Sequence, residues 1–215
     1  MIWLALALAA PLLVYVSVEL WRRPERQFTL YSSAARWGDA LPSARVLARR
    51  PARAHVRGRR QMNLGTILAR LEEWDEAREV LEVARATQAG AGDPYESLTR
   101  STLALLELRR GEVAKARDHA RAIEAGAEEL RPKARLITAA ALLVEGNAAA
   151  VKDLLGPSRP ELVSSKRPSD MALLAVLAAA APDPELEAIV KERMPLAQRK
   201  ELGGQLPLLA RVLGV

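Results

Sequence analysis

The side chains best suited to chemistry are few and lie far apart in this sequence. The only histidines are His55 and His119, and there is no cysteine. Neither histidine has a second His or Cys at the spacing of a metal site. Gly203 and Gly204 lack the following Lys-Ser/Thr of a phosphate-binding loop. The sequence therefore predicts no catalytic, cofactor or metal site, and we expect the protein not to be an enzyme.

The best-defined element is a helix hairpin at residues 63–84, which read NLGTILARLEEWDEAREVLEVA. Leu64, Gly65 and Leu68 lie on one face of a first helix, because residues three and four apart share a face. The second helix repeats this pattern at Ala77, Leu81 and Ala84. Small residues in both helices allow the backbones to approach. Trp74 is expected to pack at the open end of the hairpin.

This hairpin resembles the tetratricopeptide repeat (TPR) in its leucine–glycine pair, its small contact positions and the bulky residue before its second helix. It departs from the family where Gln61 stands in place of a favoured Trp. With Glu72 as the turn, related turns are predicted at Gly38, Gly111 and Gly146, close to the family's period of roughly 34 residues. The resemblance implies an all-α solenoid of about four helical hairpins with a C-terminal capping helix, because such repeats bury their apolar faces only by stacking.

We expect four regions along the chain: a transmembrane anchor at 1–21, a basic juxtamembrane hairpin (a degenerate repeat) at 22–57, TPR-like repeats at 58–167, and a degenerate repeat with capping helices at 168–215. Aromatic residues make up only 4% and strand patterns are absent, which favours an all-helical core rich in Ala and Leu. The apolar C-terminal segment LPLLARVLGV either packs on the preceding hairpin or forms a docking surface.

The first 21 residues predict a transmembrane helix. Up to Val18 the chain carries no charged side chain, which is about the length needed to cross a bilayer core. Trp3 and Trp21 bracket this run as interfacial aromatic residues. A cleaved signal peptide would begin with a basic region and have a shorter apolar core. The sequence therefore favours an uncleaved anchor and contact with the lipid bilayer.

Arginines follow the apolar run and are predicted to set its orientation. Arg22, Arg23 and Arg26 are assigned to the membrane surface, because positive flanks stay in the cytoplasm. The prediction is a single-pass inner or plasma membrane protein with its N-terminus outside and its repeats in the cytoplasm. Residues 22–60 hold 11 arginines and 2 acids, so this segment could contact anionic lipid, bind nucleic acid or be solvated. Nucleic acid is expected to be unlikely, because no aromatic residue is interleaved with the arginines from 49 to 60.

The resemblance also implies a partner-binding groove, because fixed positions of each first helix line the concave face in the family. Carried over to this chain, these positions are Arg59, Met62, Thr66, Ala69, Arg70, Leu98, Ser101, Leu105, Leu108, Arg109, Lys133, Leu136, Ala140, Leu143 and Val144. The Lys and Asn clamp of the family's chaperone-tail binders is absent. An apolar groove with arginine edges suits an apolar or amphipathic segment of a protein partner. Glu107, on the same helix as Leu105, requires an exposed or paired setting.

Two functions stay open at this stage. The first is a non-catalytic, membrane-anchored TPR scaffold or adaptor that binds a protein partner near the membrane. The alternative is a periplasmic-facing TPR component of a bacterial envelope assembly or secretion complex. In either case the expected partners are proteins in a membrane-associated complex, and no small-molecule substrate is expected.

Overall fold

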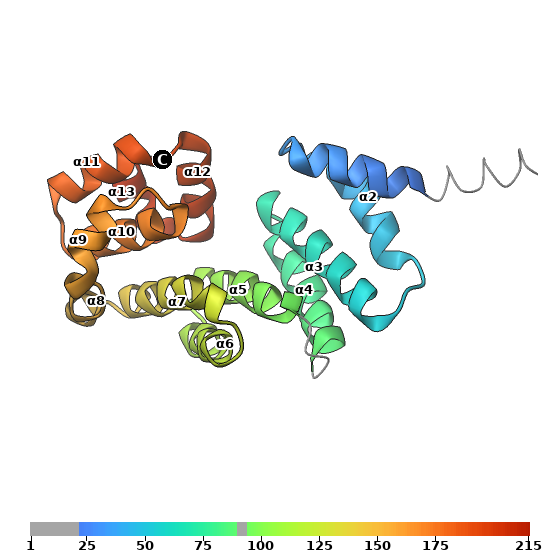
Figure 1. Ribbon diagram of the computed structural model, residues 1–215, viewed down its shortest axis with the longest axis horizontal. Coiled ribbons are helices and arrows are strands. Elements are labelled where there is room, and N and C mark those ends of the chain that lie inside the picture. Colours follow the sequence, from blue (N-terminus) through green and yellow to red (C-terminus); the bar gives the residue numbers. More distant parts are fainter. Residues whose placement is uncertain (1–21, 90–93) are drawn as a thin grey trace, which may run out of the picture.

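The computed structural model describes residues 22–89 and 94–215, and Figure 1 shows them as an arrangement of helices. Within these ranges every regular element is an α-helix or a short 3-10 helix, and no strand occurs. The expected all-α repeat architecture is therefore confirmed for the described part of the chain.

Successive helices pair as hairpins along the first two thirds of the chain. A helix that includes residues 22–33 is followed by α2 (Trp37–Arg49), α3 (Ala54–Arg70), α4 (Trp74–Gln88), α5 (Pro94–Arg109), α6 (Val113–Gly126), α7 (Arg131–Val144) and α8 (Ala148–Leu155). The C-terminal helices are α9 (Arg159–Ser164), α10 (Pro168–Ala180), α11 (Pro184–Arg193), α12 (Leu196–Gln205) and α13 (Ala210–Leu213). Short 3-10 helices lie at η1 (Glu128–Leu130), η2 (Gly156–Ser158) and η3 (Pro207–Leu209). The predicted division of this part of the chain into three regions stays a prediction, with bounds at 22–57, 58–167 and 168–215.

The four hairpin turns share one backbone geometry. Ala35, Glu72, Gly111 and Gly146 each have a positive φ, between 55° and 77°. In every case the next amide donates to the carbonyl five residues earlier, at 2.8 to 2.9 Å. This left-handed closure ends the first helix and satisfies its last carbonyls. The predicted turns at Glu72, Gly111 and Gly146 are confirmed, whereas Gly38 is wrong because it lies in the first turn of α2.

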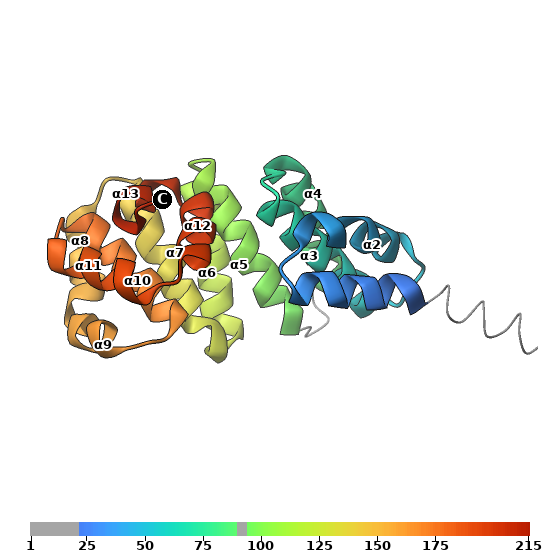
Figure 2. The same ribbon diagram turned by 90° about the horizontal axis from the view of Figure 1, so that it is seen from above.

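The apolar residues form two cores that meet at α5. The first core extends from Ala40 to Leu106 and fills the space between α2, α3, α4 and α5. The second extends from Ala104 to Leu213 and includes α10, which is buried on nearly all sides. Figure 2 shows the C-terminal helices gathered beside α5 and α7. The C-terminal apolar segment packs into the second core, as one of its two interpretations predicted.

The membrane prediction is corrected by the helices themselves. Across 22–89 and 94–215, none is both long enough and apolar enough to span a bilayer. The most apolar of them, α10, has 13 residues and is enclosed by other helices, whereas a transmembrane helix needs about 20. The predicted anchor at 1–21 lies outside the described residues. A fold class with a transmembrane helix, and single-pass membrane localisation with it, is therefore not supported.

Close packing at Gly65 gives a direct test of the hairpin. A Cβ at Gly65 would lie 2.5 Å from Leu81 Cγ and 3.2 Å from the Ala77 carbonyl oxygen. Overpacking of this kind costs about 1–3 kcal/mol, against roughly 1 kcal/mol of helix propensity that Ala gains over Gly. We therefore expect Gly65→Ala to lower the free energy of unfolding, measured by urea denaturation.

Gly156→Ala is the matched control, because a Cβ at Gly156 meets nothing within 4 Å and its backbone is right-handed helical. It should leave stability unchanged or raise it slightly. Equal stability of the two variants would contradict the close approach of α3 and α4.

Candidate functional site

A cavity of about 290 Å³ lies where α3, α5 and α7 face α12. Both views of the ribbon place α12 beside α5 (Figures 1 and 2). Seven predicted groove residues line this cavity: Thr66, Ala69, Arg70, Ser101, Leu105, Lys133 and Leu136. Thr102, Leu106 and Ile137 complete the wall contributed by the repeats. The structure thus brings together residues of three successive hairpins.

The other predicted groove residues lie elsewhere. Met62, Leu108 and Ala140 are buried in the two cores, and Leu143 and Val144 are half-buried against the second core. Leu98 lines a different cavity. Arg59 and Arg109 are exposed and stack on aromatic rings. Arg22, Arg23 and Arg26 are exposed on the helix that includes 22–33, and their assignment to a membrane surface stays a prediction.

Helix α12 supplies the side of the cavity that sequence reasoning missed. Glu201 Oε2 accepts a hydrogen bond of 2.9 Å from Arg70 Nη1, and Glu201 Oε1 lies 2.9 Å from Arg70 Nη2 in the same ion pair. Arg109 donates a hydrogen bond to the Gly204 carbonyl, and Gln205 also lines the cavity. Arg70 and Glu201 are 131 residues apart, so no periodic pattern in the sequence could connect them.

Lys133 is the second cation that lines this cavity, after Arg70. Its pKa lies below the ordinary value of 10.5 because the surrounding protein desolvates the ammonium, an effect that the Glu201 carboxylate opposes. Among the described residues, no carboxylate forms an ion pair with Lys133. The cavity therefore combines half-buried leucines with a cationic edge.

Arginines at the ends of the inner helices also connect neighbouring hairpins. The Arg70 guanidinium lies 4.4 Å from the Trp37 ring centroid, and that of Arg109 lies 4.2 Å from Trp74. Each Trp begins the second helix of one hairpin, and each Arg ends the first helix of the next. Such cation–π contacts contribute about 0.5–1 kcal/mol at exposed sites. Trp74 is a packing residue as expected, and it also fixes the position of Arg109.

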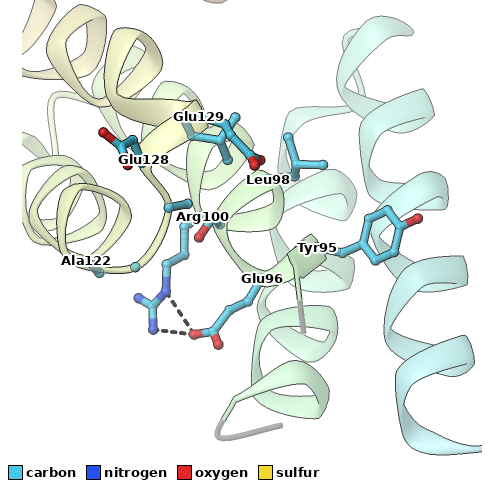
Figure 3. Close-up of a pocket in the computed structure, with 11 residues that line it drawn as sticks. Tyr95, Glu96, Leu98, Arg100, Ala122, Glu128 and Glu129 are labelled. Carbon is cyan, nitrogen blue, oxygen red and sulfur yellow. Dashed lines mark hydrogen bonds and ion pairs between the residues drawn. The ribbon is translucent and has the colours of Figure 1, made fainter. Parts of the chain in front are cut away.

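A second, larger cavity of about 700 Å³ lies between the start of α5, the end of α6 and η1. In Figure 3, Arg100 extends towards Glu96, and its Nε and Nη2 donate to one carboxylate oxygen at 3.0 and 2.7 Å. Glu128 and Glu129 lie on the η1 side of the cavity, and Tyr95 points away from it (Figure 3). Across residues 22–89 and 94–215, no three metal-binding side chains gather at one place.

Comparisons with known proteins agree with this architecture. No protein-family model and no curated protein matches the sequence. The chain is similar to two crystal structures of nearly identical TPR-like repeats of a kinesin light chain-type protein from Podosopora anserina, one of them a variant. The variant is 18% identical with a TM-score of 0.54, covering 90% of this chain and 96% of its own. The other is 19% identical with a TM-score of 0.53, covering 88% and 95%.

The fold is a TPR-like helical repeat. At these identities the similarity shows the fold alone. It confirms the resemblance at the level of the fold, and it carries no membrane anchor and no partner over to this chain.

Several buried polar side chains lie on α4, α5 and α6 and do not line the cavity at α12: Gln88, Thr99, Glu107 and His119. Glu107 is buried, and its Oε1 accepts a hydrogen bond of 2.7 Å from Arg78 Nε. This bond raises the pKa of Arg78. Of the two settings predicted for Glu107, exposed or paired, the structure has the paired one. Its Oε2 has no partner in the described structure, so the pair depends on a single bond.

Removing one member of this pair tests its contribution. Arg78→Met leaves a carboxylate buried without a cation, which costs about 3–5 kcal/mol when a buried pair is broken. We expect a loss near the lower end of that range, because the Arg78 side chain is 31% exposed. Arg78→Met with Glu107→Met should recover most of the stability in urea denaturation.

Arg117→Met is the control for this pair, because the Arg117–Glu145 ion pair is partly exposed on both sides. It should cost less than about 1 kcal/mol. A double variant no more stable than Arg78→Met would contradict the pairing argument.

His119 provides a pH-dependent test of the same region. Burial lowers its pKa from the usual 6.5, assisted by Arg100 and Arg85 and opposed by Glu82 and Glu107. Because the unfolded chain takes up this proton first, stability falls as pH decreases through about 6.5 and levels off below the folded-state pKa. His119→Gln should lose less stability than the wild type between about pH 7.5 and 5.5 in urea denaturation.

His55→Gln at an exposed position is the control for the loss of a histidine. An identical loss in wild type and His119→Gln would contradict the effect of burial on His119.

Proposed function

We propose that the protein is a non-catalytic scaffold that binds a helical segment of a protein partner in the cavity between α3, α5, α7 and α12. The observation that carries this proposal is that Leu105 and Leu136, both half-buried, line the same cavity as Arg70 and Lys133. Apolar side chains with a few placed polar groups are typical of binding sites. TPR-like arrays commonly expose such an inner surface to a partner.

The size of the cavity limits what it can hold. A volume of about 290 Å³ is at the lower end of ligand pockets. It fits the anchoring side chains of a short segment and not a folded domain. An amphipathic helix places apolar residues three and four positions apart, so one face can meet both leucines while its polar face stays in water.

The polar wall of the cavity fits this proposal. The hydroxyls of Thr66 and Ser101 donate to carbonyls of their own helices, so they line the cavity without an unmet donor. Lys133, which has no ion pair in the described structure, and Arg70, which pairs with Glu201, are then the cations of the cavity that a partner would meet.

Crosslinking from the cavity tests the proposed site. A photo-crosslinking amino acid at Leu105 or Leu136 should capture a protein partner in cells of the source organism, identified by mass spectrometry. The same amino acid at Val83, which is 51% exposed on α4, is the control and should not capture it. Equal capture from Val83 would place the binding surface elsewhere.

Substitutions that introduce a charge into the cavity give a second test, in which the affinity for the captured partner is measured. Leu105→Glu and Leu136→Glu should weaken its binding by roughly tenfold or more, because they put a carboxylate at an apolar anchor point. Val83→Glu should have no effect. Circular dichroism melts identify any variant whose loss of binding results from unfolding, and retained affinity in a folded Leu105→Glu variant would contradict the proposal.

A further inference from the structure

Helix α12 faces the cavity on one side. On its other side it packs against the rest of the C-terminal lobe, residues 159–215. Glu201, Gly204 and Gln205 face the cavity or its arginines, and their spacing of three and four residues puts them on one side of a helix. Leu202 and Gly203 are buried on the other side, where a Cβ at Gly203 would lie 2.7 Å from Val215 Cγ2. Packing against the C-terminal lobe thus sets the orientation of α12. The side of α12 that carries Glu201, Gly204 and Gln205 contacts the repeats in the way that a bound helix would.

The contact between α12 and the repeats is polar. It includes the Arg70–Glu201 ion pair and the hydrogen bond from Arg109 to the Gly204 carbonyl. The side chains of Arg70 and Glu201 are 29% and 38% exposed, and partly exposed ion pairs are weak. Leu105 and Leu136 still border open volume. A partner that buries these leucines gains an apolar contact that α12 does not make.

The charges of the cavity are unequal. Arg70 and Lys133 line it with two positive charges, whereas Glu201 is the single carboxylate in its lining. The Glu201 carboxylate forms an ion pair with Arg70, and Lys133 has no ion pair in the described structure. A ligand with one carboxylate could replace Glu201, and a ligand with two could also pair with Lys133. Charge complementarity therefore selects an acidic occupant.

We propose that α12 is a built-in competitor for this cavity, and that the partner is an amphipathic helix presenting at least two carboxylates to Arg70 and Lys133 and apolar side chains to Leu105 and Leu136. This inference rests on the proposed function, because it assigns the occupant of the same cavity. Binding of the partner displaces Glu201 from Arg70.

Two synthetic peptides serve as probes for this competition. Each is a fluorescein-labelled, Leu- and Ala-rich helix of about 15 residues, a length at which isolated helices become stable. One carries two glutamates four residues apart, and the other carries glutamines at the same positions. Binding to the full chain is measured by fluorescence anisotropy. The protein variants are Glu201→Gln, which releases Arg70, and Glu187→Gln as the matched control.

Glu187 is a suitable control because its carboxylate also pairs with an arginine of the C-terminal lobe, Arg211, at 2.8 Å, but it does not line the cavity. The acidic peptide should bind Glu201→Gln roughly two- to fivefold more tightly than wild type, the factor expected for a partly exposed ion pair. Glu187→Gln should leave its affinity unchanged. Lys133→Gln in the Glu201→Gln background should remove part of the gain.

Several outcomes would overturn the inference. These are equal or weaker binding of the acidic peptide to Glu201→Gln, an equal gain for the glutamine peptide, or no binding of the acidic peptide to any form. Capture from Leu105 together with no effect of Glu201→Gln would leave the proposed function standing and remove the role of α12. If the acidic peptide binds Leu105→Glu as tightly as it binds wild type, the proposed site would instead be contradicted.

Displacement of α12 can also be observed directly, because the chain has no cysteine of its own. Spin labels at Val46→Cys on α2 and Leu196→Cys on α12 use two exposed positions, 47% and 52% accessible. Saturating acidic peptide should change the distance distribution between the labels, and the glutamine peptide should not. An unchanged distribution with bound acidic peptide would contradict displacement.

Discussion

Helix α5 belongs to both hydrophobic cores, and the remaining helices are arranged around this shared element. Leu103 and Leu106 pack into the first core, whereas Ala104 and Leu108 pack into the second. A hairpin in a repeat array cannot bury its apolar side alone, so α5 must be covered on both sides to be stable. This double burial fixes α3 and α7 beside it. The cavity is a consequence, because it forms where these three helices face α12.

Arginines at the ends of the inner helices link packing to the site. Arg70 stacks on Trp37 of the preceding hairpin and also holds Glu201 of α12. Arg109 combines a stack on Trp74 with a hydrogen bond to the Gly204 carbonyl. A guanidinium can do both because its ring-facing surface and its N–H donors point in different directions. The stacking contacts between repeats therefore position the two guanidinium groups that bind α12.

The local elements could be predicted because they depend on neighbours in the sequence. The hairpin at 63–84 follows from small and apolar residues at helical spacing, and Gly65 lies against Leu81 as that spacing requires. The turn at Gly38 was wrong because Ala35 adopts the left-handed conformation although it is not a glycine, a choice that composition does not reveal. The membrane-spanning fold rested on residues 1–21, outside the described part. The predicted groove residues are divided among the cavity at α12, the two cores, the second cavity and the exposed surface, since exposure depends on what packs over each helix.

The sequence by itself determined the repeating hairpins, the turns at Glu72, Gly111 and Gly146, and that Glu107 had to be either exposed or paired. Each of these follows from side-chain spacing within a helix or from the chemistry of one residue. Only the tertiary structure decided which groove residues border a cavity and that α12 closes it. The physical reason is separation along the chain. Arg70 and Glu201 lie 131 residues apart, and their contact depends on the path of every helix between them.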